Sequence, residues 1–226
     1  MDRGRLRTVV SWSSGKDSAW ALHLLNQSGE VEVVGLLTTV NESYDRVAMH
    51  AIRRSLLEAQ AEAAGIPLWV VSIPSPCSNE QYEEVMSGAM RRARREGIEA
   101  VAFGDLFLAD VRAYREATLA GTGITPLSPL WGIPTDLLAA TMIAAGVRAH
   151  VTCVDPGQIP SSFVGRLWDA SFLDELPTTA DPCGENGEFH TFVSAGPMLR
   201  KAILVRQGII TEREGFVFAD LLPANS

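Results

Sequence analysis

Apolar, strand-like stretches alternate with helix-forming stretches over the first hundred residues, and this alternation constrains the fold more than any other feature. The strand-like stretches are short and apolar on both faces, as strands covered by helices are, and they span residues 6–11, 31–38, 68–72 and 100–103. The stretches between them have helical spacing and span residues 18–27, 50–64 and 79–96, with Asn79 as the expected N-cap. This pattern predicts an α/β fold with a parallel sheet that helices cover on both faces.

The alternation weakens after residue 120, where six glycines and prolines crowd residues 121–134. We therefore expect a first domain over residues 1–125 and a smaller mixed α+β domain over residues 126–226. In the second domain the patterns predict helices at 136–145 and 163–173, a polar loop at 176–187, and strands at 147–154, 189–193, 202–206 and 216–221.

The overall composition argues against several classes of protein. The net charge of −8 gives the chain no overall attraction for nucleic acid. No apolar run approaches the roughly 20 residues that span a bilayer, and the first residues do not resemble a signal peptide, so we expect a cytoplasmic protein. The three cysteines are far apart and form no CxxC pair, which argues against a disulfide framework or a thiolate zinc site.

A segment typical of anion binding lies between the first expected strand and the first expected helix, with the sequence Ser11-Trp12-Ser13-Ser14-Gly15-Lys16-Asp17-Ser18. Gly15 allows a tight turn, the start of the helix offers N–H groups and a partial positive charge, and Lys16 adds a cation. The segment is not a Walker A loop, because Val10 and Asp17 stand where that motif needs Gly and Ser or Thr. A serine-rich turn that caps a helix is the alternative, but the position after the first strand favours a phosphate-binding loop.

Residues 183–193, with the sequence CGENGEFHTFV, form the other segment that is dense in chemical groups. If the backbone is extended here, Glu188 and His190 share one face. A carboxylate beside an imidazole can move protons, orient a nucleophile or help to hold Mg²⁺. Taken alone, the residues favour the alternative, which is the entry to a hairpin with solvated charges.

Both segments resemble motifs of known families. Residues 13–18, SSGKDS, resemble the PP-loop SGGKDS of the N-type ATP pyrophosphatases, with Ser14 where that family usually has Gly. Residues 184–191 resemble the GENGE(F/Y)HT motif of the diphthine–ammonia ligase family, also called ATP-binding domain 4. Further matching segments follow in the same order: Gln60-Ala61-Glu62 with Gly65-Ile66-Pro67-Leu68, Gly104-Asp105-Leu106 with Arg112, Pro129-Leu130-Trp131, and Gly165-Arg166.

The resemblance implies an adenine-nucleotide alpha hydrolase-like, Rossmann-like domain that binds ATP, followed by a smaller acceptor domain. It also implies a ligase that adenylates a substrate carboxylate, releases pyrophosphate and lets ammonia displace AMP, with Mg²⁺ as the metal. In archaea and eukaryotes the acceptor is diphthine on elongation factor 2, and elsewhere it is unknown. A homodimer is compatible with these expectations, whereas membrane and nucleic-acid partners are not expected.

The resemblance, together with position in the fold, also assigns the site residues. The residues expected to bind ATP are Ser13, Ser14, Gly15, Lys16, Asp17, Ser18, Thr38, Gly104 and Asp105. The expected catalytic residues are Lys16, Asp105, Glu185, Glu188 and His190. The residues expected to bind the acceptor are Arg112, Glu185, Glu188, His190 and Thr191. Asp17 either holds Mg²⁺ or caps the helix, and His50 matches a family histidine at the start of the second helix.

Two other functions compete with the ligase. A PP-loop adenylase that transfers sulfur to tRNA or a small molecule would share the phosphate loop, and an ATP-binding sensor without turnover would share the nucleotide site. The sulfur-transfer enzymes often carry a CxxC pair, which this chain lacks. Cys183 is a candidate nucleophile, but no evident base precedes it, so a structural role is favoured.

Overall fold

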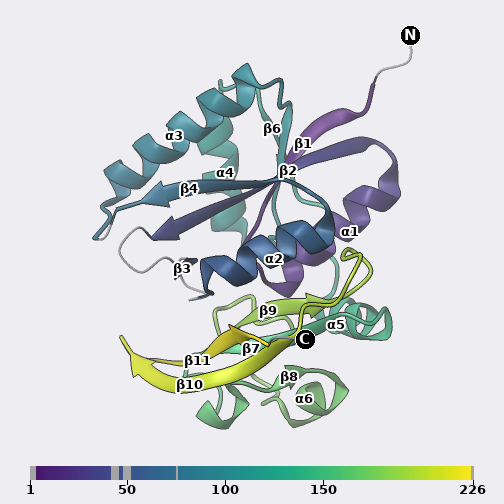
Figure 1. Cartoon of the computed structure of the whole chain (residues 1–226), viewed down its shortest axis with the longest axis vertical. Coiled ribbons are helices and arrows are strands. Elements are labelled where there is room, and N and C mark those ends of the chain that lie inside the picture. Colours follow the sequence, from purple (N-terminus) through teal and green to yellow (C-terminus); the bar gives the residue numbers. More distant parts are fainter. Residues whose placement is uncertain (1–3, 42–45, 48–51, 75, 225–226) are drawn as a thin grey trace.

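The computed structural model describes residues 4–41, 46–47, 52–74 and 76–224, and it contains two sheets with a layer of helices between them (Figure 1). The first sheet has five parallel strands in the order β4-β2-β1-β5-β6, and the short β3 pairs antiparallel with the end of β2. Its strands are β1 (Leu6–Ser11), β2 (Val31–Asn41), β3 (Arg46–Val47), β4 (Leu68–Ile73), β5 (Ala100–Ala102) and β6 (Thr125–Leu127). The expected α/β class is confirmed.

Helices cover both faces of the parallel sheet. Helices α1 (Lys16–Ser28) and α2 (Arg54–Ala64) lie on the face toward the second sheet (Figure 1). Helices α3 (Asn79–Arg95) and α4 (Ala109–Leu119) contribute to a separate apolar cluster with β-strand residues on the other face. Among the described residues, no helix combines the length and the apolarity needed to cross a membrane.

The central position of β1 fixes the location of a ligand site. The chain runs from β1 outward to β2 on one side and later to β5 on the other, so the loops that leave β1 and β5 diverge. In open α/β sheets such a switch in direction opens a crevice at the carboxyl ends of the strands. The segment 12–15 leaves β1 at this point.

The second sheet is antiparallel and is built around β7. Its strands are β7 (Arg148–Val154), β8 (Leu167–Trp168), β9 (Phe189–Ala195), β10 (Val205–Arg213) and β11 (Phe216–Pro223). Helices α5 (Thr135–Ala144) and α6 (Ala170–Glu175) and a 3₁₀ turn, Ser161–Phe163, complete this part of the chain. Strand β6, at residues 125–127, belongs to the parallel sheet and so lies across the boundary expected at residue 125.

Three of the predicted elements are wrong in detail. The helix predicted at 163–173 is broken, because Gly165 has a φ of 80° and the chain then enters β8. The helix that remains, α6, is capped by Asp169, whose carboxylate accepts a hydrogen bond from the Phe172 N–H at 2.9 Å. The N-cap of α3 is Ser78 rather than Asn79, and the last predicted strand but one begins at Val205, not at 202.

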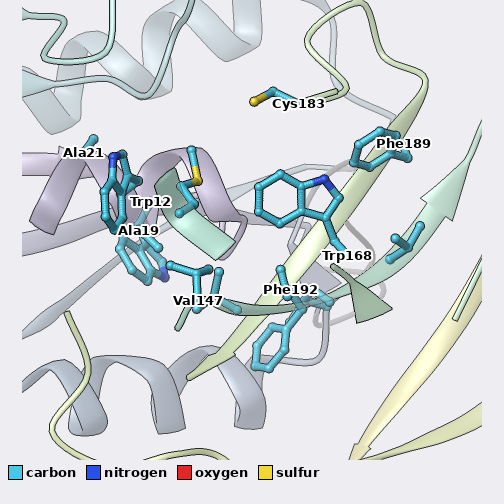
Figure 2. Close-up of a cluster of buried hydrophobic side chains, with 14 of the residues drawn as sticks. Trp12, Ala19, Ala21, Val147, Trp168, Cys183, Phe189 and Phe192 are labelled. Carbon is cyan, nitrogen blue, oxygen red and sulfur yellow. The ribbon is translucent and has the colours of Figure 1, made fainter. Parts of the chain in front are cut away.

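One continuous apolar core joins the two parts of the chain. It contains Trp12 and Trp20 from the first part and Trp168, Phe192 and Val193 from the second. Figure 2 shows Trp12, Trp168 and Phe192 as members of this buried cluster. Each part of the chain shields apolar side chains of the other part from water. Packing the two parts together therefore stabilises both sheets.

The fully buried side chain of Gln60 links three segments within this core. Its carbonyl oxygen accepts a hydrogen bond from the Trp12 indole at 2.9 Å. Its amide nitrogen donates to the carbonyl oxygen of Ser14 at 3.0 Å and to that of Val193 at 2.7 Å. Helix α2 therefore holds both the segment after β1 and the strand β9.

Replacing Gln60 with Leu should lower the free energy of unfolding by about 2–4 kcal/mol, because buried polar groups lose their partner. Urea denaturation would measure the loss. Gln27→Leu makes the same change at an exposed position of α1 and should stay within about 0.5 kcal/mol of the wild type. Equal stabilities of the two variants would contradict the role given to Gln60.

Candidate functional site

Two adjoining cavities form one cleft at the carboxyl ends of β1, β2 and β5. One cavity has a volume of about 430 Å³ and an apolar lining, and the other has a volume of about 270 Å³ and a polar lining. We call them the apolar lobe and the polar lobe. The residues that line both are Ser11, Ser13, Phe103, Arg115 and His190.

The apolar lobe lies between the end of β2 and the helices α3 and α4. Its lining includes Met86, Met90 and Tyr114. The predicted residue Thr38 lies here, and its hydroxyl is buried with no hydrogen-bond partner among the described residues. An apolar wall with one unsatisfied hydroxyl suits a flat ring that carries a few polar atoms.

Residues 13–18, which we call the phosphate loop after their expected role, contribute four residues to one wall of the polar lobe. The hydroxyl groups of Ser13 and Ser18 lie 3.1 Å apart, and the Ser13 hydroxyl accepts a hydrogen bond from the Gly15 N–H at 3.3 Å. Gly15 is the N-cap of α1, and the first three residues of the helix line the lobe. The partial positive charge at the start of the helix therefore lies at the lobe, and Gly15 has no side chain to cover it. Of the predicted cradle residues, Ser13, Lys16, Asp17 and Ser18 line the polar lobe, whereas Ser14 and Gly15 are not part of its lining.

Ser14 adopts the left-handed conformation that its glycine counterpart in the PP-loop would adopt without strain, with a φ of 71°. Its carbonyl oxygen accepts hydrogen bonds from the Val193 N–H and from the Gln60 side chain, each at 3.0 Å. Its hydroxyl is buried without a partner among the described residues. Ser14 therefore turns toward the core and fixes the loop, while Ser13 and Lys16 line the cleft.

The ammonium group of Lys16 is buried on the polar lobe. It forms an ion pair with Asp17 Oδ2 at 2.9 Å and donates a hydrogen bond to the carbonyl oxygen of Cys183. The rings of Trp168 and Phe189 lie with their centroids 5.5 Å and 5.4 Å from the nitrogen. Burial, the largest single influence, would lower the pKa of Lys16, but nearby negative charge, chiefly that of Asp17, and the hydrogen bond to Asp17 together outweigh it and raise that pKa, so the group stays charged.

Loop residues 181–188 and strand β9 form the facing wall. The Thr191 hydroxyl accepts a hydrogen bond from the Lys16 backbone N–H at 3.1 Å. Glu185 accepts one from the Leu106 N–H at 2.7 Å, yet burial raises the pKa of its carboxyl group to about 7. Burial, with the Lys16 charge adding to it, lowers the pKa of His190 to about 4, so this imidazole is neutral at neutral pH.

Glu188 does not line the polar lobe, although we expected it to share a face with His190 there. Its side chain is only 1% exposed and turns beneath the loop, where Oε1 accepts hydrogen bonds from the Asp181 N–H at 2.7 Å and from the Asn186 amide at 3.1 Å. Strand β9 begins one residue later, at Phe189, so the expected shared face with His190 does not form. Glu188 positions the loop, whereas Glu185 and His190 line the lobe.

The expectation for Arg112 also needs correction. Its guanidinium stacks on Trp131, 4.7 Å from the ring centroid, and pairs with Glu116 on the outer side of α4. Arg115 lines the cleft instead and holds Asp105, with a nitrogen–oxygen distance of 2.9 Å. None of the predicted helices covers residues 109–119, where α4 forms. A helical reading of residues 109–119 would have placed Arg112 and Arg115 one turn apart as alternatives.

Gly104 allows the end of β5 to approach the start of α1. A Cβ atom at this position would lie 2.8 Å from the backbone nitrogen of Ser18 and 2.9 Å from the carbonyl carbon of Asp17. Both contacts are closer than van der Waals separation and involve backbone, which cannot swing away. The predicted Gly104 therefore shapes the floor of the polar lobe.

Two other expectations concern metal binding and reactivity. Within the described residues, no group of three or more His, Cys, Asp or Glu side chains is arranged to hold a metal ion. Asp17 Oδ1 is buried on the lobe without a hydrogen-bond partner among those residues, which leaves one carboxylate oxygen to a cation. Burial raises the pKa of the Cys183 thiol far above its usual range, which supports a structural role. His50 lies outside the described residues.

Comparison with known proteins identifies similar sequences across nearly the whole chain. Residues 6–125 match the family model of the diphthamide synthase N-terminal domain, and residues 134–220 match that of the diphthamide synthase C-terminal domain. Human diphthine–ammonia ligase is 24% identical over 241 residues, which cover 95% of this chain and 88% of the human protein. The Danio rerio protein of the same name is 24% identical, with 88% and 86% covered. The Schizosaccharomyces pombe protein is also 24% identical, but the match covers only 36% of its length.

Gly104→Ala should destabilise the protein by about 1–3 kcal/mol, because the added methyl group forces apart two backbone segments. Thermal or urea denaturation would measure this loss. Gly88→Ala is the matched control: a Cβ there meets only the end of the Arg91 side chain at 3.7 Å, and Ala favours the helix. A Gly104→Ala variant as stable as Gly88→Ala would contradict the close approach.

Glu185→Gln should change how stability depends on pH. The folded carboxyl group has a pKa of about 7 against 4.5 as the reference value, so between these values the folded state keeps a proton that the unfolded chain has lost. The wild type therefore loses stability as pH rises through this window, and the glutamine variant does not. Urea denaturation from pH 4.5 to 8 should show that the free energy of unfolding of the variant rises relative to that of the wild type as the pH increases. Parallel curves would contradict the raised pKa.

Proposed function

The chain belongs to the diphthamide synthase family, and from this membership and the geometry of its cleft we propose that it is an ATP-dependent ligase that joins ammonia to a carboxylate. Its products are the amide, AMP and pyrophosphate. One observation carries the proposal, namely that an apolar lobe adjoins a polar lobe at the phosphate loop. Adenine and ribose suit the first lobe, and a triphosphate suits the second.

The residues of the polar lobe match the needs of a triphosphate. The start of α1 and the hydroxyl groups of Ser13 and Ser18 offer hydrogen-bond donors, while Lys16 and Arg115 supply positive charge. Mg²⁺ in nucleotide sites uses one or two carboxylates in addition to phosphate oxygens. Asp17 Oδ1 fits this requirement, because it is buried on the lobe without another partner among the described residues. A bound Mg²⁺ would neutralise phosphate charge.

The reaction needs two successive displacements. A carboxylate oxygen of the acceptor forms a bond to the α-phosphorus of ATP, and the bond from that phosphorus to its bridging oxygen breaks, so pyrophosphate leaves. The nitrogen lone pair of ammonia then forms a bond to the acyl carbon, the bond to AMP breaks, and the nitrogen loses one proton. Holding the reacting groups in line and away from water is the main contribution of the protein.

Two residues on the facing wall suit these steps. Glu185 is the acid on the polar lobe whose pKa of about 7 lets it accept the proton that the nitrogen loses at neutral pH. His190 lies where the lobes meet and remains neutral, so it offers hydrogen bonds to the reacting acyl phosphate without adding charge. The name of the relatives makes diphthine the first acceptor to test, and other carboxylates follow.

Oxygen-18 in the acceptor carboxylate provides the decisive test. Incubation with ATP, Mg²⁺ and ammonium should yield AMP that carries one labelled oxygen, because the carboxylate oxygen stays with the α-phosphorus. Mass spectrometry of AMP and of the amide would measure both steps. Diphthine-bearing elongation factor 2 and a panel of small carboxylates serve as acceptors.

Lys16→Met should reduce labelled AMP by about a hundredfold, as loss of a group that stabilises developing charge does. Lys201→Met is the matched control, since Lys201 is exposed and pairs only with Glu62 among the described residues. Unlabelled AMP, or ADP with phosphate, would contradict adenylation. If labelled AMP forms in the presence of ammonium but no amide is found, amidation is refuted. The transfer of another group is then favoured.

A further inference from the structure

The side chains around the Lys16 ammonium form an enclosure that we call the ammonium cage. It consists of the Asp17 carboxylate, the Cys183 carbonyl oxygen and the rings of Trp168 and Phe189. Both rings are only 1% exposed and the Lys16 side chain is 3% exposed, so the ammonium group is shielded from bulk water on the side of the rings, while the cage borders the polar lobe. Figure 2 shows Trp168, Phe189 and Cys183 grouped around one region of the core.

The cage has the chemistry of a site for a small ammonium ion. A carboxylate and a carbonyl oxygen accept N–H hydrogen bonds, and two aromatic faces attract a cation more strongly when water is excluded. Its present guest is the terminal ammonium group of Lys16, which differs from a free ammonium ion only in having a carbon in place of one hydrogen. The cage is therefore already proportioned for that ion.

Lys16 has a second attraction in the same lobe. The polar lobe that it lines is the place proposed for a triphosphate, which carries several negative charges, against the single charge of Asp17. A lysine side chain has a flexible four-carbon stem and moves as a point charge. A triphosphate in the lobe would therefore draw the ammonium group toward its oxygens and out of the cage.

We propose that ATP draws Lys16 out of the ammonium cage and that the vacated cage binds the ammonium ion that supplies the amide nitrogen. This inference rests on the proposed ligase function and adds a site for the second substrate. It makes binding ordered, with the nucleotide before ammonium. Glu185, two residues after Cys183 and on the same lobe, receives the proton that the ion gives up to become ammonia. Once that proton has passed to water, the same carboxylate accepts the second proton, which the nitrogen loses as the amide forms.

Crystals soaked with thallium(I), a heavy ion that resembles ammonium in charge and size, would test the order of binding. With the non-cleavable analogue α,β-methylene-ATP, anomalous scattering should place thallium beside the Cys183 carbonyl oxygen, with Lys16 on the phosphates. Without nucleotide, Lys16 should fill the cage and exclude thallium. Nucleotide bound in the cleft with Lys16 still in the cage would overturn the inference and leave the ligase intact. A cleft that binds no nucleotide would overturn both.

Lys16→Met provides a test that needs no nucleotide. This variant lacks the internal ammonium, so ammonium chloride should raise its melting temperature, while tetramethylammonium chloride at equal ionic strength should not, because that ion has no N–H donors. Wild type and Lys201→Met should show no such difference between the salts. Equal responses of Lys16→Met to both salts would overturn the inference.

The aromatic rings can be tested in the same background. Adding Phe189→Leu to Lys16→Met should weaken ammonium binding, read from the midpoint of the melting-temperature rise, by about tenfold, as loss of one desolvated cation–π contact does. Trp168→Phe keeps a ring in place and serves as the milder variant if Phe189→Leu fails to fold. Binding that is unchanged when either ring is altered would exclude a cage of this composition.

Discussion

The carbonyl group of Ser14 joins the phosphate loop to helix α2 and to strand β9. It accepts two hydrogen bonds, from the Gln60 amide and from the Val193 N–H. To point in this direction the residue takes a left-handed conformation, which costs an L-residue roughly 1–2 kcal/mol. Strain of this kind persists where surrounding contacts over-determine the conformation. The conformation of this loop thus depends on a strand from the second part of the chain.

The same dependence extends to the charges of the site. A buried ammonium group is stable only when its charge is paired and its N–H groups are satisfied. Lys16 receives its carboxylate from the neighbouring Asp17, but its carbonyl partner and its aromatic neighbours come from the second part of the chain. Its backbone N–H is satisfied by Thr191. The polar lobe is therefore assembled only when the two sheets pack together.

The sequence was sufficient to predict the parallel sheet and the loop after β1, because buried strands and glycine-rich turns have local signatures. It was insufficient where a tertiary contact decides the outcome. Arg112 and Arg115 lie on the same short helix, and only packing determines which of them turns toward Asp105. Glu188 was placed by an alternation rule that applies within a strand, but it is the last residue before β9 and its carboxylate closes the preceding loop instead.

Gln60 illustrates what a motif can and cannot reveal. The sequence offers it as part of a family-like segment in a helix, with no indication that a buried amide is required there. In the structure its amide accepts a hydrogen bond from one group and donates hydrogen bonds to two others. A side chain of the same shape without the amide would leave all three groups without this partner. This explains why the chemistry of the cleft is concentrated at the contact between the sheets. Because the conformation of the loop at residues 13–18 and the partners of Lys16 both depend on the second part of the chain, the polar lobe is complete only when the two sheets are packed together.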